Sequence, residues 1–156
     1  MLRQTSRLRF RIDTLETDMK ELKATVPLKI RFSEVDSMNI VWHGSYVMYF
    51  EDAREAFGKK YWIAYLDIFG NGYYAPLVDL SFKYKSPITY GMKPEITITY
   101  KPTDAAKIVF DYEITNTENG EVLATGHSVQ VFMDLNYQLV WVNPDFYEEW
   151  KKKWLE

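Results

Sequence analysis

The sequence predicts an α+β domain in which an antiparallel sheet curves around one long helix. Two observations lead to this prediction: a helical stripe of aromatic residues early in the chain, and several runs of alternating apolar and polar residues after it. The chain has 156 residues, of which 47% are hydrophobic and 17% aromatic, so it is large enough for one domain with a substantial core. A sheet wrapped around the helix is the simplest way to bury both apolar surfaces.

The first strand of this domain is predicted at 28–32, where apolar and charged residues alternate as in a half-buried strand. The preceding residues are rich in arginine at first and carry acids from Asp13 onward, so we predict an N-terminal extension over 1–26 and a single domain over 27–156. Met19 is an alternative start of the native protein. Because the extension has no apolar signal segment and is not free of acids, we expect neither secretion nor organelle import, and predict a cytoplasmic protein.

A helix is predicted from Gly44 to Lys60, after a polar turn at 33–39. Its apolar residues recur every three or four positions, which places them on one face of a helix. The residues of this face are Tyr46, Phe50, Ala53, Phe57 and Tyr61. A face this long and aromatic needs to be covered by other parts of the chain.

Four strands are predicted after the helix from period-two alternation. They lie at 78–84, 96–100, 108–115 and 122–134. Asn119-Gly120 predicts a hairpin turn between the last two, since both residues tolerate positive φ. A final helix is predicted to begin at Asn143-Pro144, because acidic residues come early in it and lysines late, as the helix dipole favours.

The composition excludes several kinds of site and partner. The chain has no cysteine, which rules out disulfides, thiol nucleophiles and thiolate metal sites. Its two histidines, His43 and His127, lie far apart in the sequence, so we predict no metal site and no cofactor. A net charge of −3 argues against nonspecific nucleic-acid binding. No apolar run is long enough to cross a bilayer, so we predict no membrane association.

One segment carries a recognisable set of functional residues. Its successive parts are Glu34-Val35-Asp36, Ile40-Val41-Trp42, His43 and Ser45-Tyr46. This pattern resembles the signature of the hotdog-fold acyl-CoA thioesterases of the 4-hydroxybenzoyl-CoA thioesterase family. The stretches at 50–54 and 84–87 are similar to that family's aromatic-Glu-x-Ala-Arg and Tyr-x-x-Pro motifs. The resemblance covers about residues 27–145.

The resemblance implies a hotdog fold, in which a curved antiparallel sheet wraps one long central helix. It also implies hydrolysis of acyl-CoA thioesters, or of thioesters on an acyl carrier protein, by a homodimer or homotetramer with active sites between subunits. The chain departs from the family pattern at two places. Met38-Asn39 stands where a glycine is often found, so we expect a different turn there, and Met92 replaces a common acid after the strand that ends near 84.

The resemblance implies that Asp36 is a catalytic carboxylate and that the backbone N–H of His43 stabilises the developing oxyanion. An aspartate with its ordinary pKa of about 3.9 is ionised at pH 7, so it can attack the thioester carbon directly or activate a water. The sequence leaves both roles open. The His43 ring is a further candidate for a hydrogen bond to substrate. The plain alternatives are an aspartate that only bonds its own turn, and a histidine that only caps the helix.

Four more residues are predicted to bind substrate. The aromatic side chains of Trp42 and Tyr46 are expected near an acyl pocket or a subunit interface, where large rings dominate contacts. Lys83 and Lys85 are candidates for contacts with the phosphates of coenzyme A. Core packing for the two rings, and simple solvation of the sheet for the two lysines, are the alternatives. Glu34 is expected to have a structural or solvated role.

Two other functions remain open on the sequence alone. A hotdog hydratase or dehydratase is disfavoured, because the bacterial enoyl-CoA hydratases resembling this pattern have a four-residue spacer between Asp and His, whereas six residues separate Asp36 from His43. A non-catalytic dimer that binds acyl ligands or acts as a scaffold is disfavoured by the intact segment around Asp36.

Overall fold

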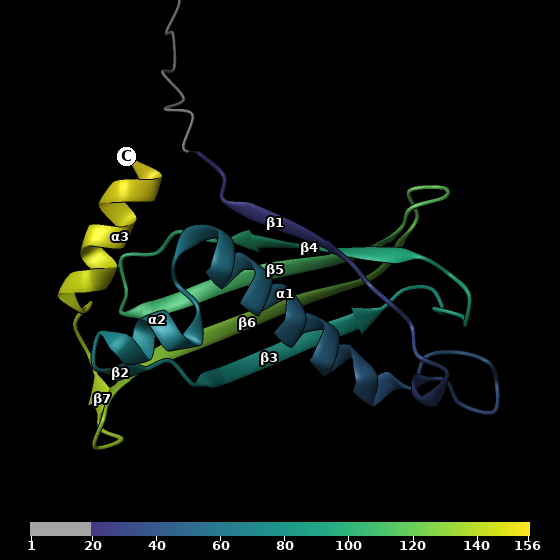
Figure 1. Ribbon diagram of the computed structural model, residues 1–156, viewed down its shortest axis with the longest axis horizontal. Coiled ribbons are helices and arrows are strands. Elements are labelled where there is room, and N and C mark those ends of the chain that lie inside the picture. Colours follow the sequence, from purple (N-terminus) through teal and green to yellow (C-terminus); the bar gives the residue numbers. More distant parts are fainter. Residues whose placement is uncertain (1–19) are drawn as a thin grey trace, which may run out of the picture.

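The structure is a computed structural model that describes residues 20–156. Met19 and most of the predicted extension lie outside the described residues. Helix α1 (Tyr46–Tyr61) lies across the inner face of a curved antiparallel sheet, and helix α3 (Asp145–Leu155) packs at one end of it (Figure 1). A short helix, α2 (Tyr65–Gly70), follows α1. The sequence prediction of an α+β fold with a long central helix and a C-terminal helix is therefore confirmed.

The sheet is formed by five main strands. They are β1 (Lys23–Pro27), β3 (Leu77–Tyr84), β4 (Pro94–Tyr100), β5 (Lys107–Asn116) and β6 (Val122–Asp134). Strand β1 pairs with β4, β4 with β5, β5 with β6 and β6 with β3, all antiparallel, so β1 and β3 are the two edges. Two short strands, β2 (Tyr73–Tyr74) and β7 (Leu139–Val140), pair with the last residues of β6.

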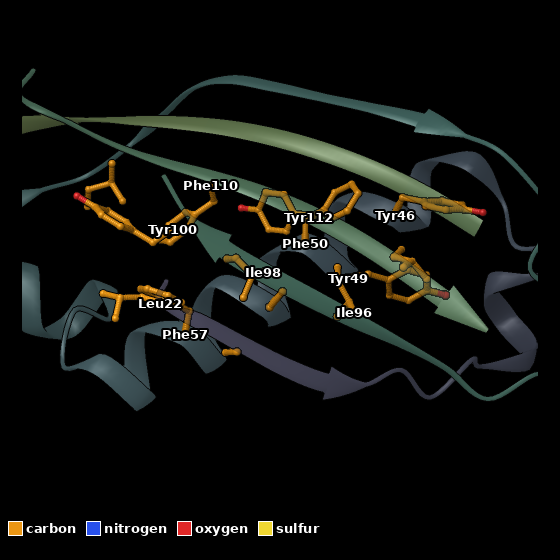
Figure 2. Packing of buried hydrophobic residues seen from close by; sticks show 14 of the residues in the cluster. Leu22, Tyr46, Tyr49, Phe50, Phe57, Ile96, Ile98, Tyr100, Phe110 and Tyr112 are labelled. Atoms are coloured by element: carbon orange, nitrogen blue, oxygen red, sulfur yellow. The ribbon is translucent and has the colours of Figure 1, made fainter. Parts of the chain in front are cut away.

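The core lies between α1 and the sheet. The predicted helical stripe is buried along its whole length, from Tyr46 at 3% exposure to Tyr61 at 8%. Its rings meet aromatic and branched side chains from the inner faces of the strands (Figure 2). The helix lies so close to the central strand β6 that a Cβ on Gly126 would come within 2.8 Å of the Phe50 ring. Helix and sheet therefore fix each other's position.

The first strand was predicted in the wrong place. Beyond β1, Leu28 keeps one bond to the partner strand, since its N–H donates to the Pro94 carbonyl at 2.8 Å, and residues 29–31 have none. Leu28 and Ile30 are buried as their alternation indicated. The cause is the partner strand, which begins at Pro94: its ring nitrogen has no hydrogen to donate, and the pairing stops there. Four of the five residues of β1, 23–26, lie in the predicted extension over 1–26, and they pair with β4.

The other element boundaries differ by smaller amounts. Helix α1 begins two residues later than predicted, because a 3₁₀ turn, η2 (His43–Ser45), precedes it. Helix α3 begins at Asp145, with Pro144 as its N-cap residue. Strand β6 has the predicted bounds. The sequence analysis missed α2, β2 and β7. No helix among residues 20–156 is both long enough and apolar enough to cross a membrane.

Candidate active site

A tight hairpin carries Asp36 to the N-terminal end of α1. The N–H of Asp36 donates to the Ile40 carbonyl at 2.9 Å, and the N–H of Asn39 donates to the Asp36 carbonyl at 3.0 Å. Asn39 has a φ of 58°, in the left-handed region that asparagine tolerates better than most residues. Asn39 therefore supplies the backbone conformation for which a glycine is otherwise suited, which explains how this turn forms without one.

The Asp36 carboxylate is held by its own turn through one oxygen. Its Oδ1 accepts the N–H of Met38 at 2.8 Å, with a longer contact of 3.5 Å to the N–H of Ile40. Among residues 20–156, Oδ2 has no hydrogen-bond donor. An aspartate that bonds its own turn was the plain alternative to a catalytic one, and Oδ1 does bond the turn. Oδ2 does not, and it belongs to a half-buried side chain.

The turn η2 presents the backbone of His43 beside this hairpin. The N–H of Trp42 donates to the Glu34 carbonyl at 2.7 Å, and the N–H of Ser45 donates to the Trp42 carbonyl at 2.9 Å. Within the described part of the chain, the N–H of His43 has no acceptor. An unpaired amide at the start of a helix, reinforced by the positive end of the helix dipole, is suited to bind a negatively charged oxygen.

Asp36 and His43 line one cavity of about 290 Å³. The remaining walls come from the hairpin, the first residue of α1 and the end of β3. They are Met38, Ile40, Val41, Tyr46, Tyr84, Lys85, Ser86 and Pro87. The cavity thus brings together four of the six residues singled out from the sequence, Asp36 and His43 among them.

Tyr46 forms part of the cavity wall and is 3% exposed. Its ring packs edge-on against Tyr84, with 4.8 Å between ring centroids, and stacks on Phe82 at 6.3 Å. Burial, with a smaller contribution from Tyr84, raises the pKa of Tyr46 to about 12. Its phenol therefore stays neutral at physiological pH.

Trp42 and Lys83 are not among the residues that line the cavity. The indole of Trp42 is half exposed, lies 4.9 Å from the His43 ring and covers Gly44, where an added Cβ would overlap it. Lys83 is exposed and alternates with Phe82 and Tyr84, whose rings pack toward α1, so it belongs to the opposite face of the sheet.

Three side-chain contacts that the sequence analysis did not predict hold the site together. Glu34 accepts the Tyr49 hydroxyl at 2.7 Å and the N–H of Arg31 at 2.9 Å, which ties the hairpin to α1. The Tyr84 hydroxyl donates to the His43 carbonyl at 2.8 Å, which ties η2 to the end of β3. No spacing rule signals the contacts of Tyr49 and Tyr84, because each joins segments that are distant in the sequence, whereas the bond from Arg31 to Glu34 is local.

His127 is remote from this cavity. It lies in the middle of β6 and its Nδ1 is 2.7 Å from Asp111 of β5, on the face of the sheet that points away from α1. No group of three or more histidine, aspartate and glutamate side chains within residues 20–156 is arranged to hold a metal ion.

A second cavity, of about 450 Å³, lies at the other end of β3, between α2, β2 and the last residues of β6. Its lining is almost entirely apolar and aromatic. It includes Leu66, Phe69, Tyr73, Tyr74, Met133 and Tyr137.

Comparisons with known proteins show that the chain is similar to thioesterases. The model of the thioesterase-like superfamily matches residues 30–151. The chain is 30% identical over 107 residues to YneP of Bacillus subtilis (strain 168), which is provisionally described as an acyl-CoA thioesterase; the match covers 69% of this chain and 77% of YneP. It is 28% identical over 115 residues to the chloroplastic acyl-acyl carrier protein thioesterase ATL3 of Arabidopsis thaliana, covering 74% of this chain and 60% of ATL3.

Among solved structures, the DHNA-CoA thioesterase of Staphylococcus aureus superposes on this chain with a TM-score of 0.74. The two are 27% identical, and the superposition covers 84% of this chain and 89% of the other.

Proposed function

This chain belongs to the thioesterase-like superfamily and is a thioester hydrolase, and we propose that it hydrolyses acyl-CoA thioesters with Asp36 as the reacting carboxylate and the His43 amide as the oxyanion donor. One observation carries the proposal: Asp36, whose Oδ2 has no donor among residues 20–156, and His43, whose N–H has no acceptor there, line the same cavity.

In the proposed reaction, the thioester carbonyl oxygen lies against the N–H of His43 and its carbon faces Asp36. Either Oδ2 attacks this carbon, or it takes a proton from a water that attacks it. Negative charge that develops on the carbonyl oxygen is stabilised by the amide and the N-terminal end of α1. The C–S bond then breaks, and the thiolate takes a proton. When Oδ2 is the nucleophile, this leaves an acyl–Asp36 anhydride, which a water then cleaves to release the acid and restore the Asp36 carboxylate. On either route, water is divided between a carboxylic acid and a free thiol.

The contacts of Asp36 suit this reaction. Because Oδ1 accepts the N–H of Met38, the carboxylate cannot turn freely, and a reacting group held in place gains much of the rate that orientation provides.

Four side chains are proposed to contact the rest of the substrate. Lys85 lines the cavity, where its ammonium group suits the phosphates of coenzyme A. Lys83 lies on the other face of β3, so its proposed phosphate contact would be made outside the cavity. Tyr46 and Trp42 offer apolar rings to the acyl group. The carrier is proposed to be coenzyme A, as for YneP, with an acyl carrier protein, as for ATL3, as the alternative.

We also propose that the active form contains a two-fold dimer joined through β3. Among residues 20–156 this strand pairs with β6 alone, which leaves its other edge for a copy of itself. Antiparallel pairing would bring the Leu77 end of one β3 beside the Tyr84 end of the other, and so the apolar second cavity of one subunit beside the first cavity of its partner.

Sedimentation equilibrium tests this assembly. We expect twice the mass of one chain, or four times if two dimers associate. The mass of a single chain at micromolar concentration would contradict it.

The reaction is tested by thiol release from acetyl-, octanoyl-, palmitoyl- and benzoyl-CoA. We expect hydrolysis of at least one of these, and Asp36→Asn is expected to lower kcat about 10²-fold or more, the scale for loss of a principal catalytic group. The matched control is Asp52→Asn, an exposed aspartate on α1, which is expected to keep the wild-type rate. Equal rates for wild type and Asp36→Asn would reject the assignment. Hydration of an enoyl-CoA without thiol release would indicate a hydratase, and binding without turnover a ligand-binding protein.

A further inference from the structure

The turn η2, called the oxyanion turn below, is held by one hydrogen bond within the turn and by another from strand β3. Inside the turn, the N–H of Ser45 donates to the Trp42 carbonyl, which belongs to the same peptide group as the N–H of His43. A donor on this carbonyl orients that peptide group and polarises its N–H. This bond is local to the turn, however, and does not fix the turn relative to Asp36.

The outside bond comes from the sheet. Tyr84 is the last residue of β3, and its hydroxyl donates to the His43 carbonyl at 2.8 Å. The Tyr84 ring is itself braced, since it packs edge-on against Tyr46 at 4.8 Å and against Phe82 at 5.4 Å. Burial raises the pKa of Tyr84, so the phenol retains the proton that it donates.

These two bonds hold the peptide groups on both sides of the His43 Cα. We propose that Tyr84 is a positioning residue for catalysis, whose hydroxyl ties the oxyanion turn to the end of β3 and so fixes the His43 N–H relative to the Asp36 carboxylate. This inference rests on the proposed function and extends it to a residue that touches the carbonyl of the turn. Orientation matters here because the rate gained from an amide donor depends on its alignment with the developing oxyanion.

Among residues 20–156, one other hydrogen bond joins the oxyanion turn to a different segment: the Trp42 N–H donates to the Glu34 carbonyl at 2.7 Å. That bond joins the turn to the hairpin, whereas Tyr84 joins it to the sheet. Without the Tyr84 hydroxyl, the turn keeps its bond to the hairpin, which is itself held by Tyr49 and by the bond from the Val41 N–H to the Ile88 carbonyl at 2.8 Å. The His43 peptide group then loses only its direct bond to the end of β3. The expected loss is therefore partial: about tenfold in kcat, which corresponds to a single neutral hydrogen bond.

Tyr84→Phe tests this proposal, because it removes the hydroxyl and keeps the ring that packs against Tyr46. The substrate is the fastest of the four acyl-CoA esters named above. We expect kcat to fall about tenfold, with KM within twofold and the melting temperature within about 2 °C. The matched control is Tyr90→Phe: Tyr90 is 52% exposed against 51% for Tyr84, and its hydroxyl has no partner among residues 20–156. The control is expected to keep the wild-type kcat.

A thioether of the same acyl group (S-octyl-coenzyme A where octanoyl-CoA is fastest) separates positioning of the oxyanion donor from general damage to the site. It has no carbonyl oxygen, so Tyr84→Phe is expected to bind it with wild-type affinity. Wild-type kcat in Tyr84→Phe, in an enzyme that loses activity on Asp36→Asn, would overturn this inference alone. A fall in kcat matched by weaker thioether binding or a large loss of melting temperature would also overturn it. Absence of thiol release by wild type would overturn the proposed function and this inference together.

Discussion

The two ends of helix α1 differ in whether a backbone amide beside them is left without a partner. At the C-terminal end, the indole N–H of Trp150 donates to the Tyr61 carbonyl at 2.7 Å, and the Tyr61 hydroxyl donates to the Lys23 carbonyl at 2.9 Å. At the N-terminal end, the N–H of His43 has no acceptor among residues 20–156, and Tyr46 borders a cavity. Figure 2 shows Tyr46 and Tyr49 at one end of the core and Tyr100 at the other.

This difference indicates that the C-terminal end of α1 stabilises the fold, whereas its N-terminal end borders the candidate site. Pairing a buried polar group contributes to stability, whereas leaving one unpaired costs about 1–3 kcal/mol. The C-terminal end pairs both the carbonyl and the hydroxyl of Tyr61, and closes with Trp62 in the left-handed conformation, at a φ of 62°. The N-terminal end keeps an amide and a carboxylate oxygen free, as a site that binds a charged transition state requires. Substitutions at the two ends are therefore expected to affect different properties.

The largest effect on stability is expected from Trp150→Ala. Trp150 is 6% exposed and packs against Tyr100 and Tyr147, with centroid distances of 5.1 and 5.7 Å. Removing it leaves a cavity and an unpaired Tyr61 carbonyl, for an expected loss of about 3–5 kcal/mol in the free energy of unfolding. Urea denaturation measures this loss.

Two measurements make the comparison informative for Trp150→Ala. Trp141→Ala is the control, because Trp141 is 82% exposed and its loss is expected to change stability by less than about 0.5 kcal/mol. Well below the melting temperature, kcat of Trp150→Ala is expected to equal that of wild type. A fall in kcat of the fully folded variant would show that the two ends are coupled.

The sequence predicted some elements of the fold accurately and misplaced another, for a physical reason. The buried stripe of α1 was found because a period of 3.6 residues depends only on which face is covered, and not on what covers it. The predicted bounds of β6 were correct because its alternation ends at clear turn residues, Asn119-Gly120 before it and Asn136 after it. Strand β1 was misplaced because its end is set by Pro94 on another strand, a constraint that local alternation does not contain.

In the candidate site too, the local sequence pattern did not contain the contacts between distant segments. The motif around Asp36 located the carboxylate and the amide, and the structure brings both to one cavity. The bond from Met38 to Oδ1 was considered only as an alternative to catalysis, whereas the structure allows both, because a carboxylate has two oxygens. The contacts from Tyr49 to Glu34 and from Tyr84 to His43 join distant parts of the chain, so they depend on tertiary packing.

Smaller and opposite effects are expected from adding one methyl group at each end of α1. A Cβ on Gly58, near the C-terminal end, would come within 2.5 Å of the Ala64 backbone, which cannot move without displacing the chain after the helix. We expect Gly58→Ala to lose about 1–2 kcal/mol of stability, since overpacking outweighs the better helix propensity of alanine, and to keep its kcat. A Cβ on Gly44, at the other end, would meet only the half-exposed Trp42 ring, which can turn outward.

Gly44→Ala is therefore expected to keep the stability of wild type and to lose several-fold in kcat, because displacement of Trp42 disturbs the turn that holds the His43 amide. Gly70→Ala is the control for both variants: a Cβ there meets open space, and neither stability nor kcat is expected to change. Urea denaturation and thiol release, measured on the same three proteins, give the comparison directly. If Gly44→Ala and Gly58→Ala lose the same property, α1 has no division between an end that stabilises and an end that reacts, and the open amide of His43 would need another explanation.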